Sequence, residues 1–445
     1  MRMAVVGTGY LGATHAACMA RLGHDVLGVD IDEAKLSKLR SGDMPFYEPG
    51  LEELTREMVA AGKLQFTSSY AEAAEFADVH FLAVGTPQKR GEFAADVSAI
   101  ESVITSLAPL INRPAVILGK STVPVGTAHE MRALARNLSP VGDELELGWN
   151  PEFLREGHAI KDTLEPDRLV VGVADDGAGR TEAVAREVYA DLLAAGVPFL
   201  LTDLATAELA KTAANAFLAT KISFINAIAE LCEAAGADVV QLADAIGYDP
   251  RIGRAFLNAG LGFGGGCLPK DIRAFMARAG ELGAAQALTF LREVDSINMR
   301  RRTQMVEMVK QSCGELLGAH VAVLGAAFKP DSDDVRDSPA LNVAGQLQLQ
   351  GATVNVYDPK AMENSRALFP TLGYSTSALE ACDNADVVVV LTEWKEFRDL
   401  DPVELAKTVR QRKMIDGRNC LDPARWTAAG WQYRGFGRAS GQSGH

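Results

Sequence analysis

The feature that most restricts the fold of this chain is a glycine-rich turn close to the N-terminus. Residues 3–6 form a short apolar run, and Gly7-Thr8-Gly9-Tyr10-Leu11-Gly12 leads from it into a helical pattern that continues to Leu22. A second apolar run follows at residues 25–30. The first glycine of such a segment makes a tight turn, the second admits a pyrophosphate, and the third lets the helix pack on the strand. The sequence therefore predicts a βαβ unit that binds a dinucleotide.

An acidic residue at the end of the second run indicates which dinucleotide is bound. Asp30 can accept hydrogen bonds from the hydroxyl groups of an adenosine ribose, and its charge would repel the 2′-phosphate of NADP. The sequence therefore favours NAD, although Lys35 is a nearby cation that weakens this preference. The cofactor residues expected in this segment are Gly7, Gly9, Tyr10, Leu11, Gly12, Asp30 and Lys35.

Strand and helix patterns alternate along the first part of the chain. Further strand patterns lie at residues 79–84, 115–118, 145–149 and 169–173. Helical patterns such as residues 97–110 and 127–137 separate them. This alternation predicts an α/β fold with a mostly parallel, doubly wound sheet over about the first 200 residues.

A second series of strands follows a long helical stretch. Residues 203–235 have a helical pattern without an internal proline, and residues 286–317 have another. The later patterns are strands at residues 321–324, 353–357, 385–391 and 414–416, with a helix at residues 339–349. We therefore expect two Rossmann-like domains, residues 1–202 and 318–437, joined by a helical connector, residues 203–317, and followed by a disordered tail, residues 438–445.

Composition excludes several kinds of partner. The net charge is −14 and the basic residues are dispersed, so the chain lacks the basic face that nucleic acid requires. The six cysteines are widely spaced without a zinc-site pattern, so we expect no metal and a reducing compartment. No apolar run is long enough to span a membrane, and the N-terminus runs directly into a strand pattern. We expect a cytoplasmic protein that binds neither nucleic acid nor membrane.

A second glycine-rich segment carries a single thiol. It reads Gly262-Phe263-Gly264-Gly265-Gly266-Cys267-Leu268-Pro269-Lys270-Asp271. Because Pro269 suits a first helical turn, Cys267 should lie just before a helix, where the helix dipole favours a thiolate. The glycines would let the backbone approach a ligand closely. Cys267 is therefore a candidate nucleophile, and the alternative is an ordinary buried cysteine in a turn.

Two polar residues interrupt the apolar face of the long helical stretch. Lys211 and Asn215 fall on the same stripe as Leu204 and Ala207. A lysine there must be paired or functional, because burying an unpaired ammonium is costly. Glu208 could be a structural partner, so the residues alone leave a catalytic and a structural role open.

Polar residues also follow three strand patterns, at the sheet edge where doubly wound folds bind ligands. Thr86 follows the first, Ser121 and Thr122 follow the second, and the segment Asn150-Pro151-Glu152-Phe153-Leu154-Arg155-Glu156 follows the third. Pro151 indicates a helical turn that would place Glu152 and Glu156 on one face. These residues could bind ligands and divide base and binding roles, or they could be ordinary turn residues and a solvated helix face.

Three cations lie beside turn residues in this acidic chain. They are Arg251, Lys329 and Arg336. Each could contact a phosphate group or be an ordinary surface charge.

The motifs together resemble those of the UDP-glucose/GDP-mannose dehydrogenase family over essentially the whole chain. They occur in the order GxGYLG, GTP, KSTVPVGT, NPEFLREG, ELAKTAANAF, RIG, GFGGGCLPKD, AFKPDSDDVRDSP and DGR. The resemblance implies a first domain that binds NAD, a helical segment that forms the core of a homodimer, and a C-terminal domain that binds the sugar nucleotide.

The resemblance also implies roles for individual residues. The implied catalytic residues are Cys267 as nucleophile, Lys211 and Asn215 as oxyanion stabilisers, Asp271 and Thr122 as groups that position a water, and Glu152 as general base. The further cofactor contacts are Thr86, Ser121, Thr122, Glu156 and Arg336. The implied substrate contacts are Glu152, Phe153, Leu154, Lys211, Asn215, Arg251, Asn258, Gly260, Gly262, Phe263, Gly264, Phe328, Lys329 and Arg418. One departure is Gly266, where many relatives have Ser.

The implied reaction is the four-electron oxidation of UDP-glucose to UDP-glucuronate with two NAD molecules. The Cys267 thiolate would capture the aldehyde as a thiohemiacetal, and the second hydride transfer would give a thioester. Water would then hydrolyse the thioester with Glu152 as base, while Lys211 and Asn215 stabilise the oxyanions.

Three other functions stay open. A related enzyme could oxidise GDP-mannose or a UDP-N-acetylhexosamine by the same chemistry, although the RIG motif and the spacing from Asn258 to Cys267 resemble the UDP-glucose branch. A non-catalytic sugar-nucleotide-binding protein would not need the intact set of catalytic residues. A two-electron dehydrogenase would not need the thiol.

Overall fold

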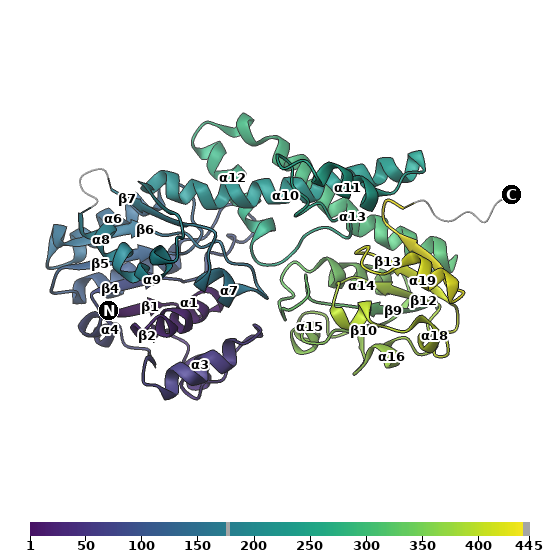
Figure 1. The fold of residues 1–445 in the computed structure, drawn as a ribbon, viewed down its shortest axis with the longest axis horizontal. Helices are drawn as coiled ribbons and strands as arrows, with labels where there is room; N and C mark the ends of the chain where they lie inside the picture. Colours follow the sequence, from purple (N-terminus) through teal and green to yellow (C-terminus); the bar gives the residue numbers. More distant parts are fainter. Residues whose placement is uncertain (175–178, 439–445) are drawn as a thin grey trace. The chain divides into compact units, whose positions relative to one another are not determined.

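The computed structural model describes residues 1–174 and 179–438 (Figure 1). They form two compact units. The first unit comprises residues 1–214 and 273–283, and the second comprises residues 215–272 and those from Ala284 onward. The three-domain division expected from the sequence stays a prediction, and the expected tail lies, apart from Arg438, outside the described residues.

The first unit is built on an eight-stranded sheet with the order β3-β2-β1-β4-β5-β6-β7-β8. The strands are β1 (Arg2–Val6), β2 (Asp25–Val29), β3 (Leu64–Thr67), β4 (Val79–Leu82), β5 (Ala115–Gly119), β6 (Leu145–Trp149), β7 (Leu169–Val173) and β8 (Phe199–Asp203). All neighbouring strands are parallel except β6 and β7, which pair antiparallel through Trp149 and Gly172. The order reverses at β1, so the crevice outside the carboxyl ends of β1 and β4 is the expected ligand site of such a sheet.

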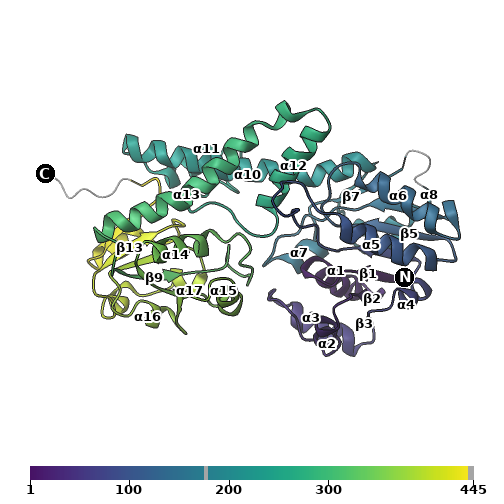
Figure 2. The ribbon, with the colours of Figure 1, turned by 180° about the vertical axis from the view of Figure 1, so that it is seen from behind.

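Alternating residues of the central strands β1, β2, β4 and β5 contribute to two separate apolar cores. Ala4 and Val6 of β1 face the core that α4 (Tyr70–Phe76), α5 (Ser98–Leu107) and α6 (Thr127–Leu138) complete. Met3 and Val5 face the opposite core, beneath α1 (Tyr10–Arg21), α2 (Glu33–Arg40) and α3 (Leu51–Ala60). Both faces of the sheet are therefore covered, which is why its strands are almost continuously apolar (Figures 1 and 2). The remaining helices of this unit are α7 (Ala159–Leu164), α8 (Gly179–Val188) and α9 (Ala190–Ala194).

Four helices follow the first sheet: α10 (Leu204–Ala235), α11 (Val239–Gly247), α12 (Leu268–Glu281) and α13 (Phe290–Cys313). The long helix α10 begins where the sequence predicts, because the Asp203 carboxylate accepts the Thr206 amide N–H at 2.8 Å as an N-cap. Within the second unit, the Ser223 hydroxyl of α10 donates to the Val294 carbonyl of α13 at 2.7 Å.

The second unit repeats the sheet topology of the first. Its six parallel strands have the order β11-β10-β9-β12-β13-β14. They are β9 (His320–Leu324), β10 (Thr353–Tyr357), β11 (Gly373–Tyr374), β12 (Val387–Val390), β13 (Lys413–Asp416) and β14 (Gln432–Gly435). The helices are α14 (Pro339–Leu349), α15 (Met362–Leu368), α16 (Ala378–Ala381), α17 (Lys395–Arg398), α18 (Pro402–Leu405) and α19 (Pro423–Ala428). The predicted α/β class with two Rossmann-like sheets is confirmed (Figure 2).

No helix in the described part of the chain is both long enough and apolar enough to cross a membrane.

One buried carboxylate fixes helix α6 to α10 within the first unit. Glu208 is 2% exposed, and its two oxygens accept the amide N–H groups of Gly126 at 2.7 Å and Ala128 at 2.6 Å. These are amide groups at the start of α6 that no helical carbonyl can satisfy. Glu208 therefore caps a neighbouring helix, a role that its position in the sequence does not indicate.

We expect the E208A substitution to lower the free energy of unfolding by about 1–3 kcal/mol, because it leaves one buried and one partly buried amide donor without acceptors. Thermal or urea unfolding followed by circular dichroism measures this change. E130A is the matched control, since Glu130 is exposed in the first turn of α6. Equal unfolding curves for E208A and E130A would contradict the capping role.

Candidate active site

The glycine-rich turn after β1 has the geometry that an anionic cofactor requires. Gly7 has φ +92°, and a Cβ atom on Gly12 would collide with the Gly7 carbonyl oxygen. A Cβ atom on Gly9 would meet nothing within 4 Å, so the backbone there is open to a ligand. Helix α1 begins at Tyr10 with no side-chain cap and no acidic residue in its first turn. Its amide groups can therefore bind a pyrophosphate, and these residues fit NAD.

Asp30 lies directly after β2, next to this turn. Its Oδ2 accepts the Thr8 amide and hydroxyl, each at 2.9 Å, and the Lys35 ammonium at 2.8 Å, while Oδ1 accepts the Asp32 amide at 3.1 Å. Burial opposes ionisation, but the hydrogen bonds from Lys35, Asp32 and Thr8 hold the pKa of Asp30 below its usual value. Asp30 is therefore anionic and retains acceptor capacity on Oδ1 for a ribose hydroxyl. Lys35 is bound to this carboxylate.

Tyr10 joins the turn to the loop after β6. Its hydroxyl donates to Glu48, and Glu48 also accepts the amide N–H groups of Gly157 at 2.6 Å and Ala159 at 2.8 Å, at the start of α7. Burial and the hydrogen bond to Glu48 raise the pKa of Tyr10 well above its usual value, so the phenol stays neutral. Glu156, an expected cofactor contact, is buried and adds to this effect. Glu48 was not expected at this site, because no motif in the sequence marks it.

The helix expected at Pro151 does not form. Residues 151–158 are irregular, and α7 begins only at Ala159. The Glu152 carboxylate accepts the amide N–H of Leu154 at 2.7 Å, a local bond that competes with helical hydrogen bonding. The expectation that Glu152 and Glu156 share one helix face is therefore wrong.

Glu152 instead forms a buried ion pair with Lys211 of α10. The carboxylate and the ammonium are 3.0 Å apart, and their side chains are only 12% and 6% exposed. The Lys211 Nζ atom is also 5.6 Å from the centre of the Phe153 ring, whose face the Arg168 guanidinium covers at 3.8 Å. Each charge offsets the cost of burying the other. Lys211, one of the two polar residues on the apolar stripe of α10, is therefore paired with a residue of the loop after β6.

The hydroxyl residues at the sheet edge connect neighbouring loops. The Thr86 hydroxyl donates to the Thr122 carbonyl at 2.7 Å, and the Ser121 hydroxyl donates to the Val84 carbonyl at 2.7 Å. Both hydroxyl oxygens can still accept a hydrogen bond from a ligand. Thr86, Ser121 and Thr122 therefore lie together at the end of β4 and β5, as the sequence predicts.

Cys267 is exposed and lies directly before helix α12, in the second unit. Its carbonyl oxygen accepts the Asp271 amide N–H at 2.9 Å, which is the first hydrogen bond of that helix. The thiol is thus at the positive end of the helix dipole, where a thiolate is favoured. The alternative of an ordinary buried cysteine is wrong, and burial instead describes Cys18, Cys232 and Cys382.

Asp271 and Asn215 form a buried polar pair beside this helix start. The Asn215 amide donates to Asp271 at 2.7 Å, and the Lys270 ammonium is 2.5 Å from the other carboxylate oxygen. Asp271 is 2% exposed and Asn215 is 8% exposed. The orientations of the Asp271 carboxylate and the Asn215 amide are therefore fixed by contacts within the second unit.

The glycines before Cys267 are required by close packing. The Gly265 amide donates to the Arg336 carbonyl at 2.9 Å, and a Cβ atom on Gly265 would lie 2.8 Å from the Phe328 ring. A Cβ atom on Gly264 would collide with the Asp337 carbonyl oxygen, and one on Gly266 with the Arg336 guanidinium. The segment around residues 328–337 therefore fills the space that side chains at positions 264–266 would need.

A cavity of about 470 Å³ in the second unit collects four of the expected substrate residues. They are Asn258, Gly260, Gly262 and Arg418. The Arg418 guanidinium donates to the Gly262 carbonyl at 2.9 Å and to the Phe328 carbonyl at 3.2 Å, so it joins the glycine loop to the second sheet. The volume is in the range of small-molecule sites, and three arginines, Arg254, Arg398 and Arg418, outnumber the one carboxylate of its lining, Glu393.

Other expected substrate residues of the second unit have different surroundings. The amide and carbonyl of Phe263 are both held by the Asn298 side chain, at 2.8 Å and 3.0 Å. The Lys329 ammonium lies 5.4 Å from the centre of the Phe328 ring. Arg251 pairs with Asp249 at 2.6 Å and its side chain is 86% exposed. Phe263, Lys329 and Arg251 are outside the set that lines the 470 Å³ cavity of the described second unit.

No group of three or more His, Cys, Asp or Glu residues in residues 1–174 and 179–438 is arranged to hold a metal ion.

Family models and full-length relatives match almost the whole chain. Residues 1–193 match the NAD binding domain of the UDP-glucose/GDP-mannose dehydrogenase family, residues 205–300 its central domain, and residues 322–423 its UDP binding domain. UDP-glucose 6-dehydrogenase of Rhizobium meliloti is 42% identical over 98% of this chain and 100% of that protein. UDP-glucose 6-dehydrogenase TuaD of Bacillus subtilis is 40% identical over 98% of this chain and 93% of that protein.

Solved structures have the same fold. A UDP-glucose dehydrogenase from Pyrobaculum islandicum has a TM-score of 0.87 and 37% identity, covering 94% of this chain and 95% of that chain. A UDP-D-ManNAc dehydrogenase from Pyrococcus horikoshii has a TM-score of 0.85 and 27% identity, covering 99% of this chain and 100% of that chain. The cofactor of the first unit is NAD, and the substrate is a nucleotide sugar. The chain belongs to the UDP-glucose/GDP-mannose dehydrogenase family.

Proposed function

We propose that this protein oxidises the primary alcohol of UDP-glucose to a carboxylate, giving UDP-glucuronate, through covalent intermediates on Cys267. The observation that carries the proposal is the exposed thiol at the start of α12, next to a glycine loop that also lines a cationic cavity. The identity to UDP-glucose 6-dehydrogenases, near 40% over the full chain, supports UDP-glucose as the hexose.

Cys267 would act after the first oxidation. The glycine-rich turn would hold NAD, which would supply the hydride acceptor for each of two oxidation steps. The Cys267 sulfur would bond to the aldehyde carbon and give a thiohemiacetal, whose oxidation leaves a thioester. Asn215 and Lys211, one helical turn apart on α10, would stabilise the oxyanions that develop on the substrate. The contact of Asn215 with Asp271 would keep its amide oriented for this role.

Glu152 would act in the final hydrolysis. Its buried ion pair with Lys211 supports a carboxylate that can take a proton from water, and Thr122 and Asp271 would help to position that water. Arg418 and the loop from Asn258 to Gly264 would hold the nucleotide sugar in the 470 Å³ cavity, with Phe328 and Lys329 nearby. Glu156, Arg336 and the hydroxyls of Thr86 and Ser121 would contact the cofactor.

We expect about two NADH formed per UDP-glucose consumed, because four electrons must leave the alcohol carbon. Absorbance of NADH against substrate loss measures this ratio. The same assay with GDP-mannose and UDP-N-acetylhexosamines should give much slower turnover. A ratio of one would exclude the thioester route, and faster oxidation of another sugar nucleotide would reassign the substrate.

We expect the C267S substitution to lower kcat by at least about a hundredfold while NAD binding is unchanged, because a hydroxyl at this position is not ionised near neutral pH. Turnover and NAD titration followed by fluorescence measure the two effects. C420S is the control, since Cys420 lines the 470 Å³ cavity but is not at a helix start. Normal turnover of C267S would refute the covalent mechanism.

We also propose a cytoplasmic homodimer whose core is helix α10. Three exposed apolar residues of this helix, Phe217, Phe224 and Leu231, recur every seven residues and therefore lie on one face. They support this face as the contact between the two subunits. Sedimentation equilibrium should give twice the chain mass of 47.4 kDa. The F224D variant should give a monomer, whereas a wild-type mass of one chain would refute the dimer.

A further inference from the structure

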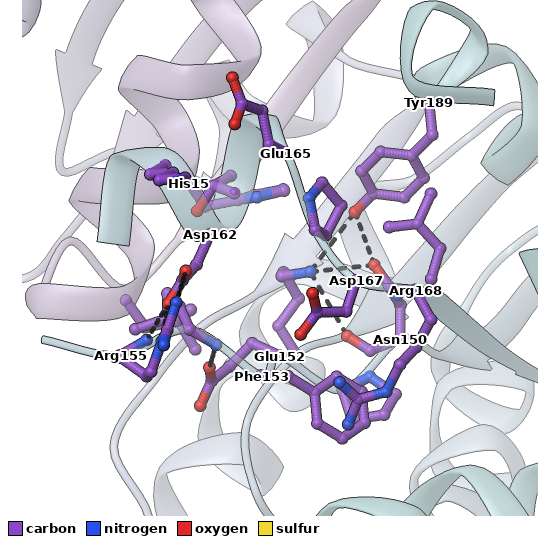
Figure 3. A pocket seen from close by; sticks show the side chains of 18 residues that line it. His15, Asn150, Glu152, Phe153, Arg155, Asp162, Glu165, Asp167, Arg168 and Tyr189 are labelled. Carbon is purple, nitrogen blue, oxygen red and sulfur yellow. Dashed lines mark hydrogen bonds and ion pairs between the residues drawn. The ribbon is translucent and has the colours of Figure 1, made fainter. Parts of the chain in front are cut away.

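A second cavity, of about 220 Å³, is lined in part by Glu152, and all of its lining residues belong to the first unit (Figure 3). Glu152, Lys120, His15 and Tyr189 are among the residues that line it. None of the expected roles uses Lys120, His15 or Tyr189. We call this cavity the Glu152 chamber.

Lys120 is the buried cation of the chamber. It follows β5 and is 6% exposed. Its ammonium donates to Asn150 Oδ1 at 2.9 Å and approaches the Tyr189 hydroxyl oxygen at 3.4 Å. The Tyr189 hydroxyl donates to the same Asn150 oxygen at 2.6 Å (Figure 3). The Asn150 amide donates to the Val170 carbonyl at 2.8 Å. Lys120 thus fixes the residue two positions before Glu152.

The acceptors of the Lys120 ammonium are all neutral oxygens. Burial lowers the pKa of Lys120 to about 8, and the charge of Glu152 opposes this change. A buried ammonium without a carboxylate in direct contact is expensive, and an apolar side chain would fill the space at lower cost. The carboxylate that stabilises the charge of Lys120 is Glu152, which lines the same cavity.

The chamber is built to hold water. The Nε2 atom of His15 is buried and has no hydrogen-bond partner among the described residues, and burial followed by the charge of Lys120 lowers the pKa of His15 well below its usual value. A buried polar atom of this kind is normally satisfied by water. At about 30 Å³ per water, the volume of about 220 Å³ holds several molecules.

We propose that the Glu152 chamber carries away the proton that Glu152 takes up during hydrolysis, and that Lys120 is a positioning residue that holds Glu152 ready to release it. The inference rests on the proposed function. In the hydrolytic step the oxygen of water bonds to the thioester carbon, one proton of that water passes to the Glu152 carboxylate, and the carbon–sulfur bond breaks. Cys267 leaves as the thiolate with the electron pair. The proton then passes from Glu152 through the chamber's water to the solvent, and no oxidation accompanies this step.

The charges that face Glu152 give this step its direction. Lys211 approaches Glu152 from α10, and Lys120 acts on it from the end of β5, while His15 on α1 is neutral. Tyr189 is also neutral, because burial raises the pKa of its hydroxyl. The other charged residues of the lining are three cations and three carboxylates: Arg155, Lys161, Arg168, Asp162, Glu165 and Asp167. They balance in number, so Lys120 and Lys211 leave the surroundings of Glu152 positive, and this favours the anion after each proton transfer.

The test compares K120M, which removes the charge, with K120Q, which also removes it but can still donate to Asn150. Both substitutions should move the acid limb of the pH profile of kcat to higher pH by about one unit, because Glu152 then holds its proton more strongly. At a given pH on that limb, kcat should therefore fall about tenfold. Their kcat should approach that of the wild type at higher pH. Quenched reactions with UDP-glucose and NAD should show by mass spectrometry more thioester on Cys267 than in the wild type.

Two controls separate this role from packing. K120R keeps the charge and should restore the wild-type acid limb. Y189F removes one hydrogen bond of the same network and should leave the position of the limb unchanged. A kcat that falls equally at all pH values in K120M and K120Q, without thioester accumulation, would overturn the inference.

E152Q distinguishes this failure from failure of the proposed function. If E152Q accumulates the Cys267 thioester but K120M and K120Q do not, only the role of Lys120 and the chamber is refuted. If E152Q gives no adduct on Cys267 and the wild type forms one NADH per sugar, the proposed function itself is refuted.

Discussion

Parallel strand pairing is the constraint on which the site of the first unit depends. Every strand from β1 to β6 ends at the same edge of the sheet, so the residues that follow these strands lie in one row. The glycine turn, Asp30, Thr86, Ser121 and Glu152 all follow such strands. Because both faces of the sheet are covered by helices, this edge is where the first unit exposes polar backbone to a ligand.

Buried charges then fix the loops that the sheet edge presents. Glu48 holds the segment before α7, Glu208 holds the start of α6, and Lys211 holds Glu152. Each contact joins residues far apart in the sequence and replaces hydrogen bonds to water that folding removes. The loops therefore have defined positions although they have no regular secondary structure, and catalytic groups on them need little rearrangement to act.

The sequence predicts those features whose physical cause is local. The turn from Gly7 to Gly12, the N-cap at Asp203 and the helix start after Cys267 all depend on residues within a few positions, and the structure has them. The prediction of a helix at Pro151 is wrong, because the Glu152 carboxylate accepts the Leu154 amide N–H in place of a helical hydrogen bond. The sequence does not decide which of these two local hydrogen bonds forms. Glu48 and Asn298 were missed for a different reason. Their partners lie between 35 and 111 positions away, so no motif or periodicity marks them.

The packing of Arg336 against Gly266 couples the nucleophile loop to a cation of the second unit. The guanidinium, held by Asp334 at 2.7 Å, occupies the space that any side chain at position 266 would need. A serine at this position would require the guanidinium to shift, which costs little because this group is the end of a flexible side chain that is 63% exposed. The residue at position 266 and the placement of the Arg336 guanidinium are therefore coupled, so a side chain just before the nucleophile would displace the cation that lies against this loop.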